Sequence, residues 1–287
     1  MNDERTVLAA FALTPGIGVK AVESLRQHFG SLSAALTVPP KTLLGVSGIG
    51  NVLAGRIAQI DPQQTASRMA HFQAQGVQIT LWGDADYPPA FIPLKDKPLI
   101  LFMVGTLTDS ERSAHKTIAI IGTREPSEHS RRRASAWANA FSQAGWTVIS
   151  GLARGIDRAA HEGALKGGGR TIAVLGSGVK SVYPPEHLPL AEQISEQGAL
   201  MCEVQPYAFP ARENLVFRNR LIVGLSHAVI VIEAGSNSGA LHAARRAHEY
   251  QIPVFAHFNS RGNQMILEQF AHQLPPSPHL LIDQLTR

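Results

Sequence analysis

The chain has 287 residues, of which 44% are hydrophobic and 17% charged, so it can form one or two domains with a sizeable core and is not a disordered chain. Its 26 Lys and Arg residues exceed its 22 Asp and Glu residues, and this mild excess is compatible with an anionic partner such as nucleic acid. Cys202 is the only cysteine, which excludes a disulfide framework and a thiolate zinc site. The acidic N-terminus does not resemble a signal peptide, and no apolar run reaches membrane-spanning length. We therefore expect a cytoplasmic protein without a membrane segment or a bound metal.

The first 60 residues have the apolar pattern of short helices. Two copies of a Gly-Ile-Gly turn, Gly16-Ile17-Gly18 and Gly48-Ile49-Gly50, separate these helices and resemble helix-hairpin-helix units. In such units glycine lets backbone N–H groups approach a DNA phosphate. The same turns could instead bury an isoleucine, bind a protein or pack against the rest of the chain, and the residues alone leave these alternatives open.

A second region begins at residue 65 with a helix over 65–75, followed by strands over 77–82 and 98–104. We expect residues 1–64 to form a small helical domain of the helix-hairpin-helix or SAM-like kind. Residues 65–287 should form a larger domain, in which 65–115 supply linking strands at the edge of the main sheet.

From Thr117 onward strands and helices alternate, which predicts a doubly wound parallel sheet of the extended Rossmann-like α/β class. The expected strands cover 117–121, 147–149, 171–175, 200–204, 229–232 and 254–257. The expected helices cover 128–144, 156–166, 188–197, 218–225, 239–250 and 264–272. Ligands of such sheets bind at the carboxyl ends of the strands, so those ends are where we look for the site.

Four Gly/Ser-rich turns follow these strands, and two of them carry an arginine, Arg124 or Arg154. Backbone N–H groups at such turns favour an anion, and the arginines add positive charge. The chain lacks the Gly-x-x-x-x-Gly-Lys-Ser/Thr phosphate loop and the Gly-x-Gly-x-x-Gly dinucleotide fingerprint, so we expect no nucleotide hydrolysis and no dinucleotide cofactor. Asp157 and Glu233 could in principle form an acid–base pair. A helix-dipole role for Asp157 and a backbone or arginine partner for Glu233 are simpler.

The segment from Gln205 to Asn219 interleaves aromatic residues with arginines. Guanidinium groups suit phosphates and flat or apolar side chains suit unstacked bases, which indicates single-stranded nucleic acid. The alternative is that Phe209 and Phe217 anchor the loop on the core.

These motifs together resemble the DNA-processing protein A (DprA/Smf) family of bacterial natural transformation. The resemblance covers about residues 117–245, and the hairpins and residues 83–88 upstream also fit it. The residues that carry it are Ile121-Gly122-Thr123-Arg124, Ser150–Asp157 with Ala160-His161, Gly169–Gly178, Tyr183-Pro184, Arg218-Asn219-Arg220 with Gly224–Ser226, and Glu233–Gly235 with Ser238-Gly239.

The resemblance implies a non-catalytic, single-stranded DNA-binding homodimer without cofactors, which protects incoming strands and helps to load a RecA-type recombinase. By resemblance, Gly122, Arg124, Ser150, Gly151 and Arg154 would hold phosphates, while Arg212 and Leu215 occupy DNA-contacting positions. The full set of expected DNA-contacting residues is Gly122, Thr123, Arg124, Ser150, Gly151, Arg154, Arg212, Asn214, Leu215, Phe217, Arg218, Arg220, Gly235, Ser238 and Gly239. The family usually has a phenylalanine where this chain has Leu215, which stacks less well, and Phe217 could compensate.

Two other functions remain as alternatives. One is a nucleotide phosphoribohydrolase-like enzyme with Glu233 and Arg124 as catalytic and phosphate-holding residues, although the Pro-Gly-Gly-x-Gly-Thr loop of those enzymes is missing. The other is an adaptor without DNA contact, which fits the N-terminal helices but not the arginine-rich strand ends.

Overall fold

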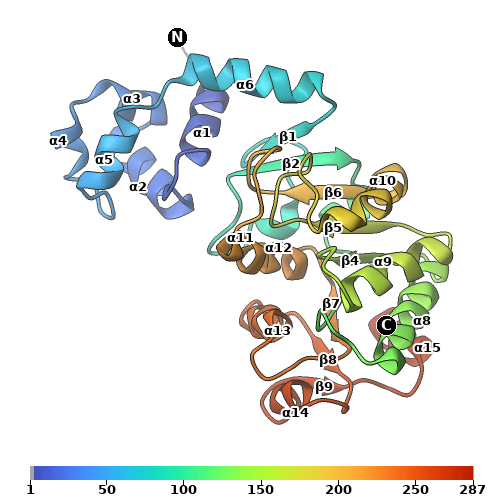
Figure 1. The fold of residues 1–287 in the computed structure, drawn as a ribbon. Helices are drawn as coiled ribbons and strands as arrows, with labels where there is room; N and C mark the ends of the chain where they lie inside the picture. The colour runs from blue at the N-terminus through green and yellow to red at the C-terminus, as the bar shows by residue number, and fades with distance from the viewer. Residues whose placement is uncertain (1–2, 287) are drawn as a thin grey trace.

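The computed structural model describes residues 3–286 as a helical region joined to an α/β region (Figure 1). The expected N-terminal helices are confirmed, and two short helices add to them. The helical region contains α1 (Glu4–Ala12), α2 (Val19–Phe29), α3 (Leu32–Thr37), α4 (Pro40–Leu43), α5 (Asn51–Ile57) and α6 (Pro62–Ala74).

The two Gly-Ile-Gly turns have matching geometry. Gly16 and Gly48 have φ values of +82° and +83°, in the left-handed region that favours glycine. Ile17 and Ile49 are both buried, so the interpretation of each turn as an anchor for a core isoleucine is confirmed.

The core of the helical region is continuous with part of the core of the sheet region. One apolar cluster runs from Phe11 and Leu25 in the helices to Leu81 and Phe102 in the sheet. The expected boundary between residues 64 and 65 falls inside α6, a single helix that begins after its N-cap, Asp61. An ion pair of 2.9 Å between Arg5 and Asp84 adds a polar tie between the regions.

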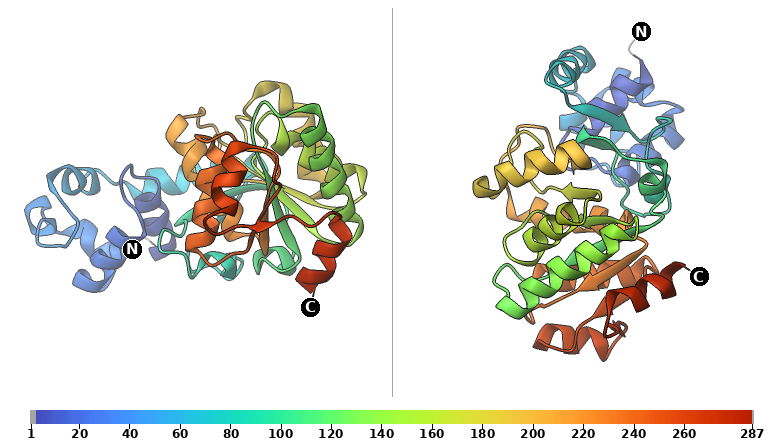
Figure 2. Two further views of the ribbon diagram at one scale, coloured as in Figure 1. Left: turned by 90° about the horizontal axis from the view of Figure 1, so that it is seen from below. Right: turned by 90° about the vertical axis from the view of Figure 1, so that its right-hand side faces the viewer.

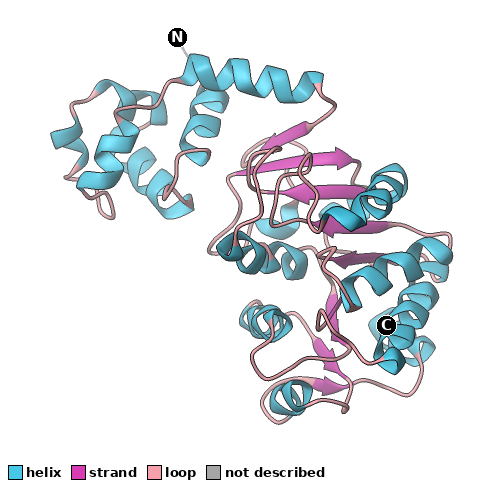
Figure 3. Ribbon diagram, viewed as in Figure 1, coloured by secondary structure: helices cyan, strands magenta, loops and turns pink. Residues whose placement is uncertain are grey.

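The α/β region is built on one nine-stranded sheet in the described residues, with the order β1-β2-β6-β5-β4-β3-β7-β8-β9. Figure 3 shows its strands in magenta. Strands β3 to β9 confirm the doubly wound prediction, because all the pairings among them are parallel. The edge strands β1 and β2 pair antiparallel. The strands are β1 (Gln78–Leu81), β2 (Ile100–Gly105), β3 (Thr117–Ile121), β4 (Thr147–Ser150), β5 (Thr171–Val174), β6 (Ala199–Cys202), β7 (Ala228–Val231), β8 (Val254–Ala256) and β9 (His272–Gln273).

Helices cover both faces of the sheet, because successive side chains of each strand point to opposite faces (Figure 2). Ile118 and Ile120 of β3 pack with one helical layer, and Ala119 and Ile121 pack with the other. The first layer includes α8 (Glu128–Gln143), α9 (Ile156–Lys166) and α15 (Pro278–Thr286). The second includes α12 (Asn219–Gly224), α13 (Gly239–Glu249) and α14 (Arg261–Leu267). Helix α10 (Leu188–Gln197) packs on β5 and β6.

The chain changes direction at β3, which sets the place of the site. Strands β4, β5 and β6 extend from one side of β3, and β7 then pairs with its other side. The segment between β6 and β7 therefore crosses back over the strand ends. It contains α11 (Arg212–Phe217) as well as α12, whereas the sequence predicted a loop up to Asn219 and one helix over 218–225. The predicted helix 264–272 is also wrong at its end, because α14 stops at Leu267 and β9 follows.

Candidate nucleic-acid interface

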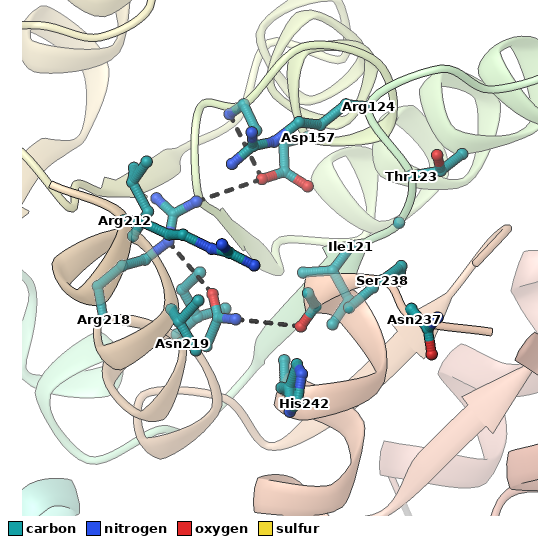
Figure 4. A pocket seen from close by; sticks show the side chains of 18 of the residues that line it. Ile121, Thr123, Arg124, Asp157, Arg212, Arg218, Asn219, Asn237, Ser238 and His242 are labelled. Carbon is teal, nitrogen blue, oxygen red and sulfur yellow. Dashed lines mark hydrogen bonds and ion pairs between the residues drawn. The ribbon is translucent and has the colours of Figure 1, made fainter. Parts of the chain in front are cut away.

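A pocket of about 660 Å³ lies at the carboxyl ends of β3, β4 and β7, where the strand order reverses. Its walls come from the turn after β3, the start of α9, the α11–α12 segment and the start of α13 (Figure 4). We call it the switch-point pocket. Open α/β sheets bind ligands at this topological position, so the fold directs attention to the residues that line it.

Close backbone packing positions Arg124 at the pocket. Gly155 has φ +79°, and a Cβ there would lie 2.4 Å from the carbonyl oxygen of Thr123. A Cβ on Gly122 would lie 2.5 Å from Ile156. Both glycines let the turn after β3 press against the start of α9. Packing against the start of α9 therefore fixes the backbone of the turn, while the Arg124 side chain stays exposed.

Two arginines in the pocket remain free to bind an anion. Arg124 and Arg212 both line the pocket and are both exposed, and neither forms a salt bridge within residues 3–286. They come from opposite walls, one from the turn after β3 and the other from the first residue of α11. Two unpaired guanidinium groups facing one space favour a ligand with more than one negative charge.

Arg218 is buried and serves the framework instead. One of its nitrogens, Nη1, donates to the carbonyl oxygens of Gly151 and Val174, and Nε donates to Asn219 Oδ1 at 3.2 Å. Asn219 in turn donates to the Gly239 carbonyl oxygen at 3.1 Å (Figure 4). This chain of contacts ties the ends of β4 and β5 to the start of α13. Gly151 is needed here because a Cβ would lie 2.3 Å from the Arg218 guanidinium.

Asp157 lies beneath Arg218 and is also buried. Its Oδ2 atom is 3.9 Å from Arg218 Nη2 and accepts from the Gly151 backbone N–H at 3.2 Å. Burial raises the pKa of this carboxyl, and the positive charge of Arg218 opposes that change. Burial also disfavours the charged form of the Arg218 guanidinium, so it lowers the pKa of that group. Asp157 thus acts as the local counter-charge for Arg218.

The N-terminus of α13 lies at the pocket beside these arginines. Its N-cap, Ser238, makes no side-chain capping hydrogen bond, and Ser238 Oγ is buried without a partner in the described structure. Asn237 precedes it, and His242 lies one turn further along the helix. The first-turn N–H groups of a helix carry partial positive charge, so this end of α13 supports the charge of the two free arginines.

An apolar wall faces these polar groups. Leu215 and Val216 of α11 line the pocket together with Pro210 and Tyr183. Leu215 is held closely, since a Cβ on Gly176 would lie 2.6 Å from its Cα. The glycines of the turn after β5 are therefore explained by packing against the crossing segment, and this turn supplies no lining residue.

The switch-point pocket brings together eight of the fifteen predicted residues. These are Gly122, Thr123, Arg124, Arg212, Leu215, Arg218, Ser238 and Gly239. Gly151 and Arg154 line a small neighbouring hollow that shares Arg124 and Leu215. Arg154 already has a partner there, because its Nε donates to Glu186 at 2.5 Å.

The other five predicted residues do not line the pocket. Ser150 is buried and donates to the Ile120 carbonyl oxygen at 2.7 Å, so it supports the sheet. Arg220 is also buried, bonds to Glu203 and lies 4.0 Å from the centre of the Phe217 ring. Phe217 and Arg220 line a second cavity, whereas Arg218, between them in the chain, lines the switch-point pocket. Asn214 and Gly235 lie outside both lining sets.

The lining also contains residues that the sequence reasoning did not select. Asn219 and Asn237 lie inside motifs that were recognised, so their neighbours could have indicated them. His242 also lines the pocket, and no local pattern marks it. Its place depends on how α13 packs, which only the tertiary structure shows.

Two further observations concern the described residues as a whole. Within residues 3–286 no group of three or more His, Cys, Asp or Glu side chains is arranged to hold a metal ion. The helices of the same range include none that is both long and apolar enough to cross a membrane.

Comparisons with known proteins agree with this geometry. The profile of the family "DNA recombination-mediator protein A" matches residues 78–276. Protein Smf of Synechocystis is 36% identical over 90% of this chain and 66% of its own length. DNA processing protein DprA of Bacillus subtilis is 34% identical over 66% of this chain and 63% of its own length. The chain thus spans less than two thirds of the length of these two curated relatives.

Solved structures show the same fold. The structure of DNA processing protein A from Streptococcus pneumoniae superposes with a TM-score of 0.82 at 25% identity, covering 99% of both chains. DNA processing protein A from Helicobacter pylori, whose structure was solved for its single-stranded DNA binding mode, superposes with a TM-score of 0.65 at 30% identity, covering 73% of this chain and 96% of the other. The strand-end motifs, the family match and these superpositions place this chain in the DNA recombination-mediator protein A family, which includes the DprA and Smf proteins.

Proposed function

We propose that this protein binds single-stranded DNA in the switch-point pocket. The observation that carries the proposal is the pair of exposed, unpaired arginines, Arg124 and Arg212, beside the uncapped N-terminus of α13. Adjacent phosphates of a DNA backbone carry the separate negative charges that this arrangement fits.

A single strand fits the pocket better than a duplex. The pocket has an apolar wall that includes Leu215 and Tyr183, against which an unstacked base can pack. Phe209, which was weighed as a loop anchor, is 85% exposed on the segment that leads into α11. Its ring is available to a second base just outside the pocket. Bases in a duplex are already stacked and cannot use these surfaces.

Further properties are part of the same proposal. Its support is the family to which the chain belongs and the single-stranded DNA binding described for the Helicobacter pylori relative. We infer a cytoplasmic, non-catalytic homodimer, joined largely through the α/β region, that protects DNA strands during natural transformation and helps to load a RecA-type recombinase. Protection against nuclease, the mass in solution and stimulation of recombinase filament assembly are the measurements that test these points.

Glu233 and Asp157 both have partners within the protein, which favours DNA binding over hydrolysis of a nucleotide. Glu233 accepts hydrogen bonds from the Ser127 backbone N–H at 3.1 Å and its hydroxyl at 2.9 Å, and it does not line the pocket. Asp157 is buried under Arg218. Neither carboxylate is placed to attack a glycosidic bond of a nucleotide in the pocket. Release of free base from a panel of nucleoside monophosphates would favour the phosphoribohydrolase alternative instead.

The test is a salt titration of binding to labelled single-stranded and duplex oligonucleotides, with the wild type and Arg124→Ala. We expect the wild type to prefer the single strand and Arg124→Ala to weaken binding to all sequences about tenfold, with a salt slope lower by about one. Lys41→Ala, which removes one exposed charge from α4, is the control and should bind like the wild type. Equal affinities for wild type and Arg124→Ala would refute the assignment of the pocket.

A further inference from the structure

A second cavity, of about 740 Å³, lies between the helical region and the sheet region. Both Gly-Ile-Gly hairpins reach it, through Gly16–Gly18 and Gly48. The loop 95–100 and the residues Phe217 and Arg220 form the opposite wall. The proposed DNA-binding function uses none of these groups. We call this space the interdomain cavity.

Gly18 lines the cavity at the N-terminus of helix α2. Its φ is −116°, which any residue can adopt, and a Cβ there would meet nothing within 4 Å. Neither backbone strain nor packing therefore requires a glycine at this position. Gly18 is the N-cap of the 11-residue helix α2 and supplies no side-chain capping bond, so the first-turn N–H groups remain available to a ligand.

Arg220 gives an independent sign of a ligand that carries hydrogen-bond acceptors. Its side chain is only 2% exposed, and Nε and Nη1 have no hydrogen-bond acceptor among the described residues. Nη2 bonds to Glu203, Nε lies 4.0 Å from Asp96 Oδ2, and the Phe217 ring covers the guanidinium. A buried guanidinium with two nitrogens that lack an acceptor is costly unless another group can complete its hydrogen bonds.

The charge and shape of the cavity suggest what that group belongs to. Lys20 and Lys95 are exposed, line the cavity and form no ion pair within residues 3–286, whereas Lys97 is 3.8 Å from Glu23. Apolar groups, among them Leu53, Leu99 and the half-exposed Phe217 ring, lie beside these charges. The volume is within the range of small-molecule sites at domain interfaces and larger than a phosphate ion alone would need.

We propose that the interdomain cavity binds a nucleotide, with the phosphate at the N-terminus of α2 and Lys20 and the base against the apolar wall near Phe217. The nucleotide is either free in solution or a unit of a DNA strand that extends beyond the switch-point pocket. The α11–α12 segment separates the two cavities, with Arg212 and Arg218 on one side and Phe217 and Arg220 on the other. The interdomain site is thus distinct from the proposed DNA pocket.

The decisive variant is Gly18→Asp. An aspartate N-cap would accept hydrogen bonds from the free N–H groups of α2, which stabilises the helix while occupying the phosphate position. Gly50→Asp is the matched control, because Gly50 is the N-cap of α5, also has room for a Cβ and does not line the cavity. Both variants should unfold at or above the wild-type temperature, so a loss of binding cannot be a loss of fold.

The measurements are titrations of fluorescent AMP and ATP and of short and long oligothymidylates. We expect saturable nucleotide binding that Gly18→Asp weakens about tenfold or more and that Gly50→Asp and Arg124→Ala leave unchanged. If Gly18→Asp weakens only the free nucleotides, they are the ligand; if it also weakens the long oligonucleotide, the ligand is a unit of the strand. The proposal fails if the wild type binds neither AMP nor ATP and Gly18→Asp binds the long oligonucleotide normally. It also fails if Arg124→Ala removes nucleotide binding, which would place the ligand in the switch-point pocket.

Discussion

The arginines in and beside the switch-point pocket have two opposite uses. Arg124 and Arg212 are exposed and unpaired in the switch-point pocket of the described structure, whereas Arg218 and Arg220 are 8% and 2% exposed in their side chains and are bonded to the protein. All four looked alike as basic residues near strand ends. The difference shows that a basic motif combines exposed arginines, which we propose as ligand contacts, with buried arginines that build the site.

The largest expected effect tests the framework role of Arg218. Arg218→Ala leaves Asp157 buried without its counter-charge and the Gly151 and Val174 carbonyl oxygens without their donor. Loss of one partner from a buried pair typically costs about 3–5 kcal/mol. Urea denaturation should show this loss in the free energy of unfolding. Arg212→Ala should stay within about 0.5 kcal/mol of the wild type, as expected for a surface change. Equal stability of the two variants would contradict the distinction between framework and ligand arginines.

The next prediction tests the ligand role of the exposed pair. The double variant Arg124→Ala/Arg212→Ala removes two phosphate partners, so its salt slope for single-stranded DNA should fall by about two. Its free energy of unfolding should match that of the wild type, because neither side chain has an ion pair in residues 3–286. Salt titration and urea denaturation of one preparation give both values. A double variant that loses stability but keeps the wild-type salt slope would show that Arg124 and Arg212 support the fold and do not contact DNA.

Acid stability gives a third test, because His161 is buried in the same framework. Burial, followed by the positive charges of Arg218 and His187, lowers its pKa to about 3 from an ordinary value of 6.5. The folded state therefore holds a neutral histidine, and its contribution to stability is present above pH 6.5 and is lost as the pH falls from 6.5 toward 3. The slope is up to about 1.4 kcal/mol per pH unit. Urea denaturation at several pH values should show a shallower slope for His161→Asn. An unchanged slope would show that other groups cause it.

The smallest effect separates two serines that were both expected to contact DNA. Ser150→Ala removes a buried hydrogen bond to Ile120, which should cost about 1 kcal/mol of stability without changing DNA affinity. Ser238→Ala removes a hydroxyl that has no partner in the described structure, so stability should be unchanged while DNA affinity falls severalfold. Thermal melts and oligonucleotide titrations of both variants measure the contrast. Loss of affinity in Ser150→Ala alone would refute this distinction.

Much of this protein could be predicted from local patterns. The runs of β-branched residues ended by glycine predicted the strand β3 to the residue, and apolar periodicity located helices α9 and α10 with correct bounds. These signals are strong because a buried parallel strand must be apolar on both faces. The strand-end motifs also indicated the family and the edge of the sheet where Arg124 lies.

The direction of each side chain was decided only by the tertiary structure. The return of the chain from β6 to β7 places α11 and α12 over the strand ends, and the helical geometry then points Arg218 and Arg220 into different surroundings. His242 and the open position at Gly18 also depend on packing between distant segments. Sequence periodicity reports which residues share a face of one element, but burial and ion pairing depend on what other elements bring to that face. The sequence by itself therefore determined the sheet and its basic edge, and only the folded arrangement separated free arginines from structural ones.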